Sequence, residues 1–280
     1  MVLWMIGLGL GDEGDITVKG LDVVKRSDHV YLECYTSVLP GLGREELCRA
    51  YGVPEILEAD RDLVESGCEE MLERARSSDS TVSFLVVGDA LCATTHTDIW
   101  LRARQEGIDV RVVHNASVMS AIAACGLQLY RFGETISICL WDGNWKPDSY
   151  YDKIVRNRQA GLHTLCLLDI KVKERTPENL MRNRQIFEPP RFMTVAEAVE
   201  QLVEIEEQRG QGVAGPESRL VGVARLGRAD QVVAFGTCAE LQAADLGPPL
   251  HSLVVPAPEL HELEAEFLQF HRVPAGVADE

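Results

Sequence analysis

A glycine-rich loop follows the first apolar run of the chain. Gly9-Leu10-Gly11-Asp12-Glu13-Gly14 matches the G-x-G-x-x-G pattern, and Glu33 ends the next apolar run about twenty residues later. In a dinucleotide site such glycines open into a helix whose N-terminal amides hold a pyrophosphate. Here Asp12, Glu13 and Asp15 occupy the turn where the phosphates would lie, and like charges oppose binding there. The loop therefore favours a tight strand-end turn that lets the backbone approach another ligand, with dinucleotide binding as the alternative.

Two further polar residues fall where predicted strands end. Asp89 follows the apolar run 82–87, and Ser117 follows the run 110–113. Because open α/β sheets bind ligands beyond the carboxyl ends of their strands, both residues are candidate ligand contacts. Asp89 could accept hydrogen bonds from a ligand or form a turn, and Ser117 could contact a ligand while capping a helix.

The remaining reactive side chains do not form a recognisable catalytic set. His96-Thr97-Asp98 resembles part of a metal-ligand cluster, but the sequence has no second cluster at suitable spacing and no H-E-x-x-H, so we predict no metal site. No Ser-His-Asp or Cys-His arrangement is evident either, and we assign no catalytic residue. Tyr130, Trp141 and Trp145 could form an aromatic wall for a cationic substrate group, or they could pack as ordinary core residues.

Short apolar runs alternate with amphipathic segments through the first 115 residues. The runs are brief, rich in β-branched residues and bounded by turn residues, which predicts strands. The predicted strands span residues 2–8, 29–33, 53–57, 82–87 and 110–113, and the predicted helices span 17–27, 43–51, 60–77 and 97–106. This alternation predicts a parallel sheet flanked by helices.

The pattern changes after residue 115. Strands are predicted at 135–140, 163–169, 220–226, 231–235 and 251–255, and helices at 117–123, 195–209 and 259–270. The runs 220–226 and 231–235 are separated by a short turn, which predicts a hairpin and some antiparallel pairing. We therefore expect an α/β protein of two domains, residues 1–115 with a mainly parallel sheet and residues 116–280 with a mixed sheet.

The composition of this 280-residue chain restricts the classes of partner that it can bind. Acidic residues outnumber basic ones 44 to 27, and the net charge of −17 opposes binding to nucleic acid or to anionic membranes. The apolar run 2–6 is too short for a signal peptide or a membrane span. Eight cysteines without a C-x-x-C pair favour buried free thiols over disulfides or zinc, so we expect a cytoplasmic protein.

Ten segments in the same order along the chain together resemble the diphthine synthase family. The two most specific are Ala93-Thr94-Thr95-His96-Thr97-Asp98 and Leu165-Cys166-Leu167-Leu168-Asp169-Ile170-Lys171-Val172-Lys173-Glu174. The others span residues 7–12, 31–37, 87–89, 114–117, 126–135, 145–149, 188–193 and 249–253. The resemblance covers roughly residues 1–270, nearly the whole chain.

The resemblance implies the tetrapyrrole-methylase fold, in which two α/β domains hold S-adenosylmethionine in the cleft between them, usually as a homodimer. It implies elongation factor 2 as the substrate, with methylation of its modified histidine on the way to diphthamide. Residues 165–174 and 145–148 look more like eukaryotic than archaeal members. Eukaryotic members add three methyl groups to the amino nitrogen and one to the carboxylate, which gives diphthine methyl ester.

The family's cofactor contacts carry over to named positions of this chain. They are Leu10, Asp89, Cys92, Ser117, Val118, Leu168, Leu226 and His251. One stretch departs from the family, because Ala90-Leu91-Cys92 stands where members usually have Pro-Phe-Gly. A cofactor contact made by the backbone of Cys92 survives this change. The loss of proline and glycine is expected to weaken cofactor binding more than it alters the fold.

Two other functions remain as alternatives to this methyltransferase. One is a methylase of the same fold that acts on a tetrapyrrole, and the other is a protein that binds elongation factor 2 without turnover. A basic stretch is also present in this acidic chain, and it either faces the protein substrate or forms a solvated loop. It comprises Lys171, Lys173, Arg175, Arg182, Arg184 and Arg191.

Overall fold

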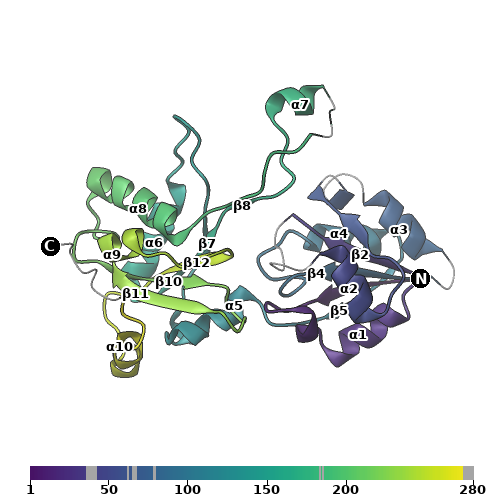
Figure 1. Ribbon diagram of the computed structural model, residues 1–280, viewed down its shortest axis with the longest axis horizontal. Helices are drawn as coiled ribbons and strands as arrows, with labels where there is room; N and C mark the ends of the chain where they lie inside the picture. The colour runs from purple at the N-terminus through teal and green to yellow at the C-terminus, as the bar shows by residue number, and fades with distance from the viewer. Residues whose placement is uncertain are drawn as a thin grey trace. The chain divides into compact units, whose positions relative to one another are not determined.

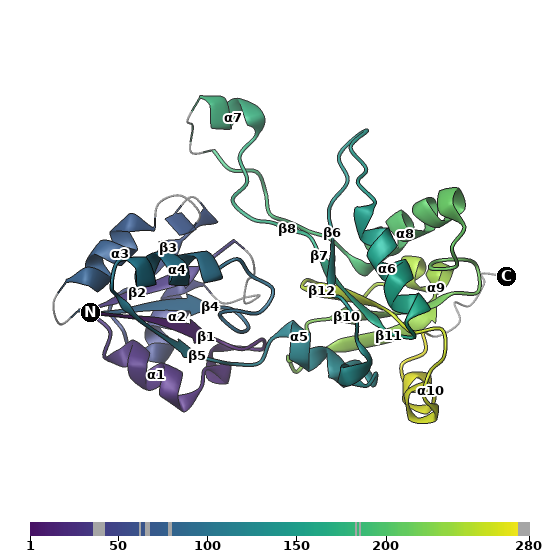
Figure 2. The same ribbon diagram turned by 180° about the vertical axis from the view of Figure 1, so that it is seen from behind.

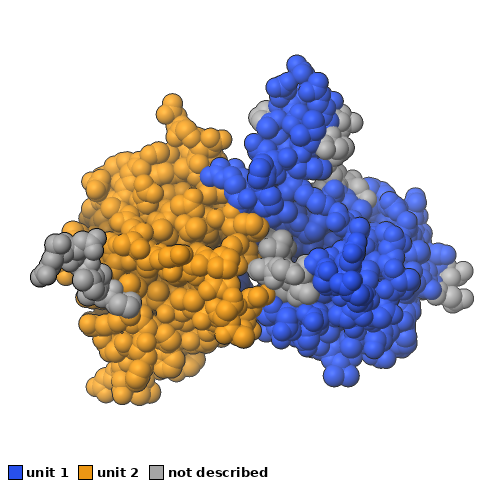
Figure 3. Space-filling view, in the orientation of Figure 1, with its two compact units in different colours: residues 1–119, 170–191 blue, residues 120–169, 192–280 orange. Residues whose placement is uncertain are grey.

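The computed structural model describes residues 1–35, 43–61, 63–64, 68–77, 80–182, 184 and 186–273. The chain forms two compact units (Figure 3). Unit 1 contains residues 1–119 and 170–191, and unit 2 contains residues 120–169 and 192–280. The sequence patterns place the division after residue 115 and assign 170–191 to the second domain, whereas the contacts group this segment with unit 1. Two ion pairs attach it there, from Lys173 to Glu58 and from Arg61 to Glu174.

Unit 1 is built on a five-stranded parallel sheet in the order β3-β2-β4-β1-β5 (Figure 1). The strands are β1 (Val2–Gly7), β2 (His29–Glu33), β3 (Leu57–Ala59), β4 (Thr81–Val86) and β5 (Asp109–Val113). The helices are α1 (Val18–Lys25), α2 (Arg44–Tyr51), α3 (Glu69–Arg76) and α4 (Thr97–Gln105). Gly7 pairs with Val86, and Ile6 pairs with Val113, so β1, β4 and β5 end at the same edge.

Both faces of this sheet are covered, as the predicted alternation of strands and helices requires. Along β1, Leu3 and Met5 pack into one buried cluster, while Ile6 and Leu8 pack into another. Successive side chains of a strand point to opposite faces, so each face has its own core. The predicted α/β class with a parallel sheet is confirmed for this unit.

Two predicted elements of unit 1 differ from the structure. The strand expected at 53–57 begins only at Leu57, because Gly52 ends α2 in a left-handed conformation and Pro54 has no amide to donate to a ladder. The helix expected at 60–77 is a regular α-helix only over α3. Residues 62 and 65–67 lie outside the described residues.

Unit 2 contains a mixed sheet in the order β11-β10-β12-β7-β6, in which only β6 and β7 pair in parallel. Its strands are β6 (Ile136–Ile138), β7 (Thr164–Leu168), β10 (Arg219–Ala224), β11 (Val232–Thr237) and β12 (His251–Val255). Its helices are α6 (Ser149–Gln159), α8 (Val195–Arg209), α9 (Cys238–Ala243) and α10 (Glu262–Gln269), and α5 (Val118–Ala121) leads into it. The predicted hairpin is confirmed by the antiparallel pairing of β10 with β11.

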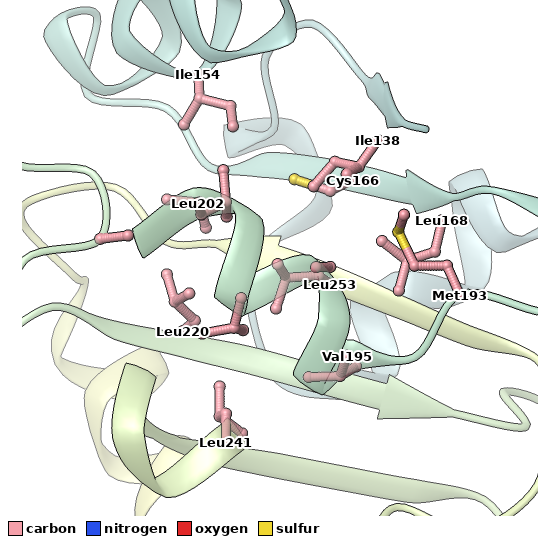
Figure 4. Close-up of a cluster of buried hydrophobic side chains, with 14 of the residues drawn as sticks. Ile138, Ile154, Cys166, Leu168, Met193, Val195, Leu202, Leu220, Leu241 and Leu253 are labelled. Carbon is pink, nitrogen blue, oxygen red and sulfur yellow. The ribbon is translucent and has the colours of Figure 1, made fainter. Parts of the chain in front are cut away.

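The core of unit 2 lies between its sheet and α8. Figure 4 shows Leu253 and Cys166 from the sheet together with Leu202 and Val195 from α8. The helix begins at a capping box in which Thr194 and Glu197 satisfy each other's backbone amides. Sequence patterns predicted α8 but missed α6 and α9, although α9 also begins with a T-x-x-E capping box.

Residues 170–191 lie between the two parts of unit 2 in the sequence and form a separate segment. The short strands β8 (Ile170–Lys171) and β9 (Arg191–Phe192) pair at its base, and α7 (Pro177–Met181) lies at the end of two extended legs (Figures 1 and 2). All eight cysteines lie in the described part of the chain and are free thiols, and four of them are buried as predicted, whereas Cys34, Cys48, Cys92 and Cys139 are partly exposed. Among the described residues, no helix has the length and apolar character needed to cross a membrane.

A buried carboxylate joins three segments of unit 2. Glu264 has no exposed surface, and its two oxygens accept four hydrogen bonds. The donors are His163 Nε2 at 3.1 Å, Arg131 Nη1 at 2.7 Å and the backbone amides of Gln128 and His261 at 2.9 Å each. Burial would raise the pKa of Glu264, but these hydrogen bonds outweigh it and lower the pKa.

The imidazole partner of this carboxylate is neutral. Nδ1 of His163 accepts a hydrogen bond of 2.9 Å from the amide of Ala257, so the ring proton lies on Nε2 and is donated to Glu264. Burial lowers the pKa of His163, and it outweighs the opposite effect of Glu264. The network therefore needs an ionised Glu264 carboxylate and a neutral His163 imidazole with its one proton on Nε2.

Replacing Glu264 should destabilise unit 2 strongly. Glu264→Gln removes the charge while leaving Arg131 and the buried donors in place, and breaking a buried pair in this way costs about 3–5 kcal/mol. Guanidinium unfolding followed by circular dichroism measures the loss. Glu266→Gln, on the exposed side of the same helix, is the matched control and should change the free energy of unfolding by less than about 0.5 kcal/mol.

The same network predicts that unit 2 loses stability in acid. The lowered pKa of Glu264 stabilises the fold above the carboxyl's unfolded pKa of about 4.3, and this contribution is lost as the pH falls through the folded value. The lowered pKa of His163 acts in the same direction once the pH drops below about 6.5, because only the unfolded state then binds a proton readily. Unfolding curves between pH 7 and pH 2 should show this decline, and the part of it below about pH 4.3 should be smaller in Glu264→Gln, which lacks the titrating carboxyl.

Candidate functional site

The loops at the carboxyl edge of the unit 1 sheet approach one another closely. Gly9 and Gly88 exchange two backbone hydrogen bonds of 3.1 and 2.7 Å just beyond the ends of β1 and β4. A Cβ atom on Gly7 would lie 2.6 Å from the carbonyl oxygen of Gly88, closer than real contacts allow. Glycine at position 7 is therefore required by this close approach of two backbones.

The glycine-rich loop is occupied by a carboxylate of the chain itself. The Oδ2 atom of Asp15 accepts hydrogen bonds from the amides of Leu10 at 3.2 Å and Gly11 at 2.7 Å. In a dinucleotide site such amides would face a phosphate. Because Asp15 takes these donors and adds a negative charge, the loop is unsuited to a phosphate ligand, and Leu10 contributes an apolar side chain at its start.

Asp89 is almost completely buried, with 4% of its surface exposed. Its Oδ1 accepts from the amide of Leu91 at 2.9 Å, and its Oδ2 accepts from the amide of Asn115 at 3.0 Å and from Nδ1 of His114 at 2.9 Å. Burial would raise the pKa of Asp89, but these hydrogen bonds outweigh it and lower the pKa. The carboxylate is thus ionised, and it ties the loop after β4 to the loop after β5.

Asn115 connects the same loops to the glycine-rich turn. Its Nδ2 donates to the carbonyl oxygens of Gly7 at 3.0 Å and Asp15 at 2.9 Å. This one side chain places Ser117 and Val118, at the start of α5, next to the ends of β1 and β4. Ser117 is buried beside Gly88. A Cβ atom added to Gly88 would lie 3.8 Å from the Cβ of Ser117.

The stretch that departs from the family pattern keeps a relaxed backbone at Cys92. The left-handed conformation falls on the next residue, Ala93, with φ of 58°. The amide of Cys92 bonds to the carbonyl of Asp89 at 3.3 Å, and the buried His96 holds the carbonyl of Ala90 through Nδ1 at 3.1 Å. Replacing glycine with cysteine therefore places no side chain in a disfavoured φ region.

The other three predicted cofactor residues gather at one end of the unit 2 sheet. His251 pairs with Ala224, and the next residue of β12 pairs with Leu167. The strands β7 and β10 therefore both end next to His251, at the start of β12. Leu168 is the last residue of β7, and Leu226 follows the end of β10 by two residues. Five of the eight predicted residues thus gather at one edge of the unit 1 sheet and three at one end of the unit 2 sheet.

His251 and Arg225 are held by carbonyl groups of one loop. His251 accepts from the amide of Val195 through Nδ1 at 3.3 Å, and its Nε2 lies 3.0 Å from the carbonyl of Gly247. Arg225, buried and left-handed with φ of 51°, donates through Nη1 to the carbonyls of Leu246 and Pro248 at 2.7 Å each. Burial lowers the pKa of His251, so the imidazole is neutral near pH 7. Both side chains shape the loop before β12.

The aromatic wall for a substrate group stays a prediction, whereas the alternative of core packing is excluded for Tyr130 and Trp145, which are 83% and 59% exposed. Tyr130 precedes β6 and Trp141 and Trp145 follow it, so these side chains lie at opposite ends of that strand. The ring of Trp141 already faces a cation of the chain, because Nζ of Lys146 lies 4.7 Å from its centroid.

Sequence reasoning missed Asn115 and Arg225 as organising residues. Asn115 lies in the segment 114–117 that resembles the family, but the residues it contacts lie at least a hundred residues away in the sequence. The sequence pattern gave no signal for Arg225, which is buried. Among the described residues, no group of three histidine, cysteine or acidic side chains could hold a metal ion, and Asp98 pairs with Arg102 at 2.7 Å.

Removing the carboxylate from the glycine-rich loop should loosen it. Asp15→Ala leaves the amides of Leu10 and Gly11 without their acceptor, so hydrogen exchange of a peptide covering 7–15 should be at least about tenfold faster, for a loss of about 1.5 kcal/mol. Glu13→Ala removes a neighbouring negative charge while keeping Asp15 and is the control. Equal exchange rates in the two variants would show that Asp15 does not hold the loop.

Comparison with known proteins identifies the class. A family model for Tetrapyrrole (Corrin/Porphyrin) Methylases matches residues 2–242. The diphthine methyl ester synthase of Eremothecium gossypii is 55% identical over 95% of this chain and 89% of its own length, and the human one is 52% identical over 99% and 98%. A crystal structure of diphthine synthase, 34% identical, superposes with a TM-score of 0.81 over 97% of this chain and 96% of that chain.

These matches define the chain as a methyltransferase that belongs to the tetrapyrrole methylase family. Its strand order, with one parallel and one mixed sheet, agrees with that class. Within the family, the chain belongs to the diphthine methyl ester synthases, the group that works in diphthamide biosynthesis.

Proposed function

We propose that this methyltransferase uses S-adenosylmethionine to methylate the modified histidine of elongation factor 2. It places three methyl groups on the amino nitrogen and one on the carboxylate, which forms diphthine methyl ester. The observation that carries the proposal is identity of 52–55% with diphthine methyl ester synthases from human and Eremothecium gossypii over nearly the whole chain. The family resemblance also supports a cytoplasmic homodimer as the working form.

The residues at the unit 1 edge suit a sulfonium nucleoside better than a phosphate ligand. The amides of Leu10 and Gly11 are taken by Asp15, so the loop presents a carboxylate where a phosphate would need donors. The apolar side chains of Leu10 and Val118, with the Asp15 carboxylate beside Leu10, suit a ligand that is cationic and partly apolar, and Asp89 and Ser117 complete the proposed contacts. The Cys92 backbone adds a further contact.

The residues of unit 2 play a supporting part in the same proposal. Leu168 and Leu226 supply apolar walls for the cofactor. The two ring nitrogens of His251 already engage Val195 and the carbonyl of Gly247, so this residue acts by fixing the loop before β12 rather than by donating to a ligand. Cofactor contacts near His251 are therefore made by backbone groups.

The chemistry requires positioning more than acid–base catalysis. When bound, S-adenosylmethionine supplies an electrophilic methyl group that the substrate's nitrogen or carboxylate oxygen takes by direct displacement. An α-amino group with a pKa of about 8 is already partly neutral at pH 7, and a carboxylate needs no deprotonation. The chain's loops therefore need only align the two ligands and exclude water.

Loss of the Asp89 charge should weaken the cofactor complex. Asp89→Asn exchanges an acceptor for an amide that faces the donors of Leu91, Asn115 and His114, and losing a charged hydrogen bond costs about 1.5–3 kcal/mol. Calorimetry should show S-adenosylmethionine affinity falling about 10- to 100-fold. Asp109→Asn, at the opposite end of β5, is the matched control and should bind as the unaltered protein does.

Mass spectrometry of the modified histidine peptide tests the activity itself. Elongation factor 2 from cells lacking this methyltransferase, incubated with the protein and S-adenosylmethionine, should gain four methyl groups. Gain of fewer would correct the proposed methyl count. Methylation of uroporphyrinogen without the factor would support a tetrapyrrole methylase, while factor binding without any methyl transfer would support a non-catalytic binding protein.

A further inference from the structure

The excursion at residues 170–191, here called the basic arm, has the opposite charge to the rest of the protein. It carries six basic and three acidic residues in a chain with a net charge of −17. Lys173 pairs with Glu58 and Arg182 pairs with Glu178, while Arg184 and Arg191 are exposed. The arm therefore presents a local positive charge that an acidic surface would complement.

Large apolar side chains lie exposed among these cations. Met181 at the end of α7 is 81% exposed, Ile186 is 57% exposed and Phe187 is 42% exposed. Phe187 and Val172 also form the apolar part of a cavity of about 220 Å³ at the base of the arm, and its other lining residues are charged, namely Asp60, Arg61, Lys173, Glu174 and Arg175. A cavity of this size can accept one side chain of a partner, and apolar residues exposed beside a pocket are typical of protein interaction sites.

Hydrogen bonds and an ion pair hold the described residues of the arm together, as a docking element needs. The amide of Glu188 bonds to the carbonyl of Glu174 at 2.8 Å and joins the two legs. At the tip, Nδ2 of Asn179 donates to the carbonyl of Ile186 at 3.3 Å. At the base, Arg61 pairs with Glu174 at 2.9 Å. Binding would therefore cost less conformational entropy than ordering a flexible loop.

We propose that the basic arm docks the protein substrate by contacting an acidic surface with an apolar centre on elongation factor 2. This inference rests on the proposed function, because it names how the same enzyme recognises a folded protein rather than a small molecule. Met181 and Ile186 supply apolar contacts, the cavity beside Phe187 takes one side chain of the factor, and Arg182 and Arg184 provide the charge. The arm acts on recognition and takes no part in methyl transfer.

Steady-state methylation of the intact factor tests the apolar contacts. In Met181→Asp/Ile186→Asp, KM for elongation factor 2 should rise at least about tenfold while kcat stays within about twofold, and S-adenosylmethionine affinity should not change. Leu101→Asp alters an exposed leucine on α4 of the same unit and is the matched control. All three altered side chains are exposed, and a thermal unfolding curve checks that each variant is folded.

A second variant tests the charge. Arg182→Gln/Arg184→Gln should raise KM at low salt and should flatten its increase with ionic strength, because a screened attraction has been removed. A proteolytic peptide of the factor that contains the modified histidine lacks the docking surface. Its methylation should therefore be the same in both arm variants and in the unaltered protein.

Three results would overturn the proposal. One is an unchanged KM for the intact factor in both arm variants, and another is a fall in kcat alone. The third is a change from dimer to monomer in sedimentation with KM unchanged, which would assign the arm to a second copy of this chain. If the unaltered protein does not methylate the factor, the proposed function fails, and direct binding of the factor to the protein and to the arm variants still decides the role of the arm.

Discussion

The unit 1 site depends on how the chain satisfies its backbone where three parallel strands stop pairing. Beyond the ends of β1, β4 and β5, amides and carbonyls that would pair in a ladder need other partners. Asp15, Asp89 and Asn115 provide them, each reaching from its own loop to atoms of another or across a tight turn. Because leaving such groups buried and unpaired costs about 1–3 kcal/mol each, the three loops hold one another in a fixed arrangement.

Unit 2 uses the opposite chemistry for a similar purpose. There the loop before β12 turns its carbonyl groups inward, and Arg225 and the neutral His251 donate to them. At these strand ends, Asp15 and Asp89 accept hydrogen bonds from amides in unit 1, whereas Arg225 and His251 donate to carbonyls in unit 2. In both units these polar side chains hold the loops at the strand ends, so their hydrogen-bonding groups are engaged by the chain itself.

The sequence predicted those parts of the site that depend on local patterning. Leu10, Asp89 and Ser117 each follow a β-branched run, and parallel strands bring their carboxyl ends to one edge, so their gathering could be expected. The contacts of Asn115 with residues 7 and 15 could not, because they depend on the register of β1 against β5. The burial of Arg225 could not be predicted for a related reason, because it depends on a loop about twenty residues further along the chain.

The stretch Ala90-Leu91-Cys92 shows how such long-range contacts can replace local backbone preferences. Proline and glycine would fix this turn through their own φ restrictions or freedom. Here the turn is fixed instead by Asp89, which receives the amide of Leu91, and by the buried His96, which holds the carbonyl of Ala90. The left-handed residue is Ala93, where a small side chain keeps the strain low. A turn held by hydrogen bonds with Asp89 and His96 no longer needs the residues that would otherwise specify it.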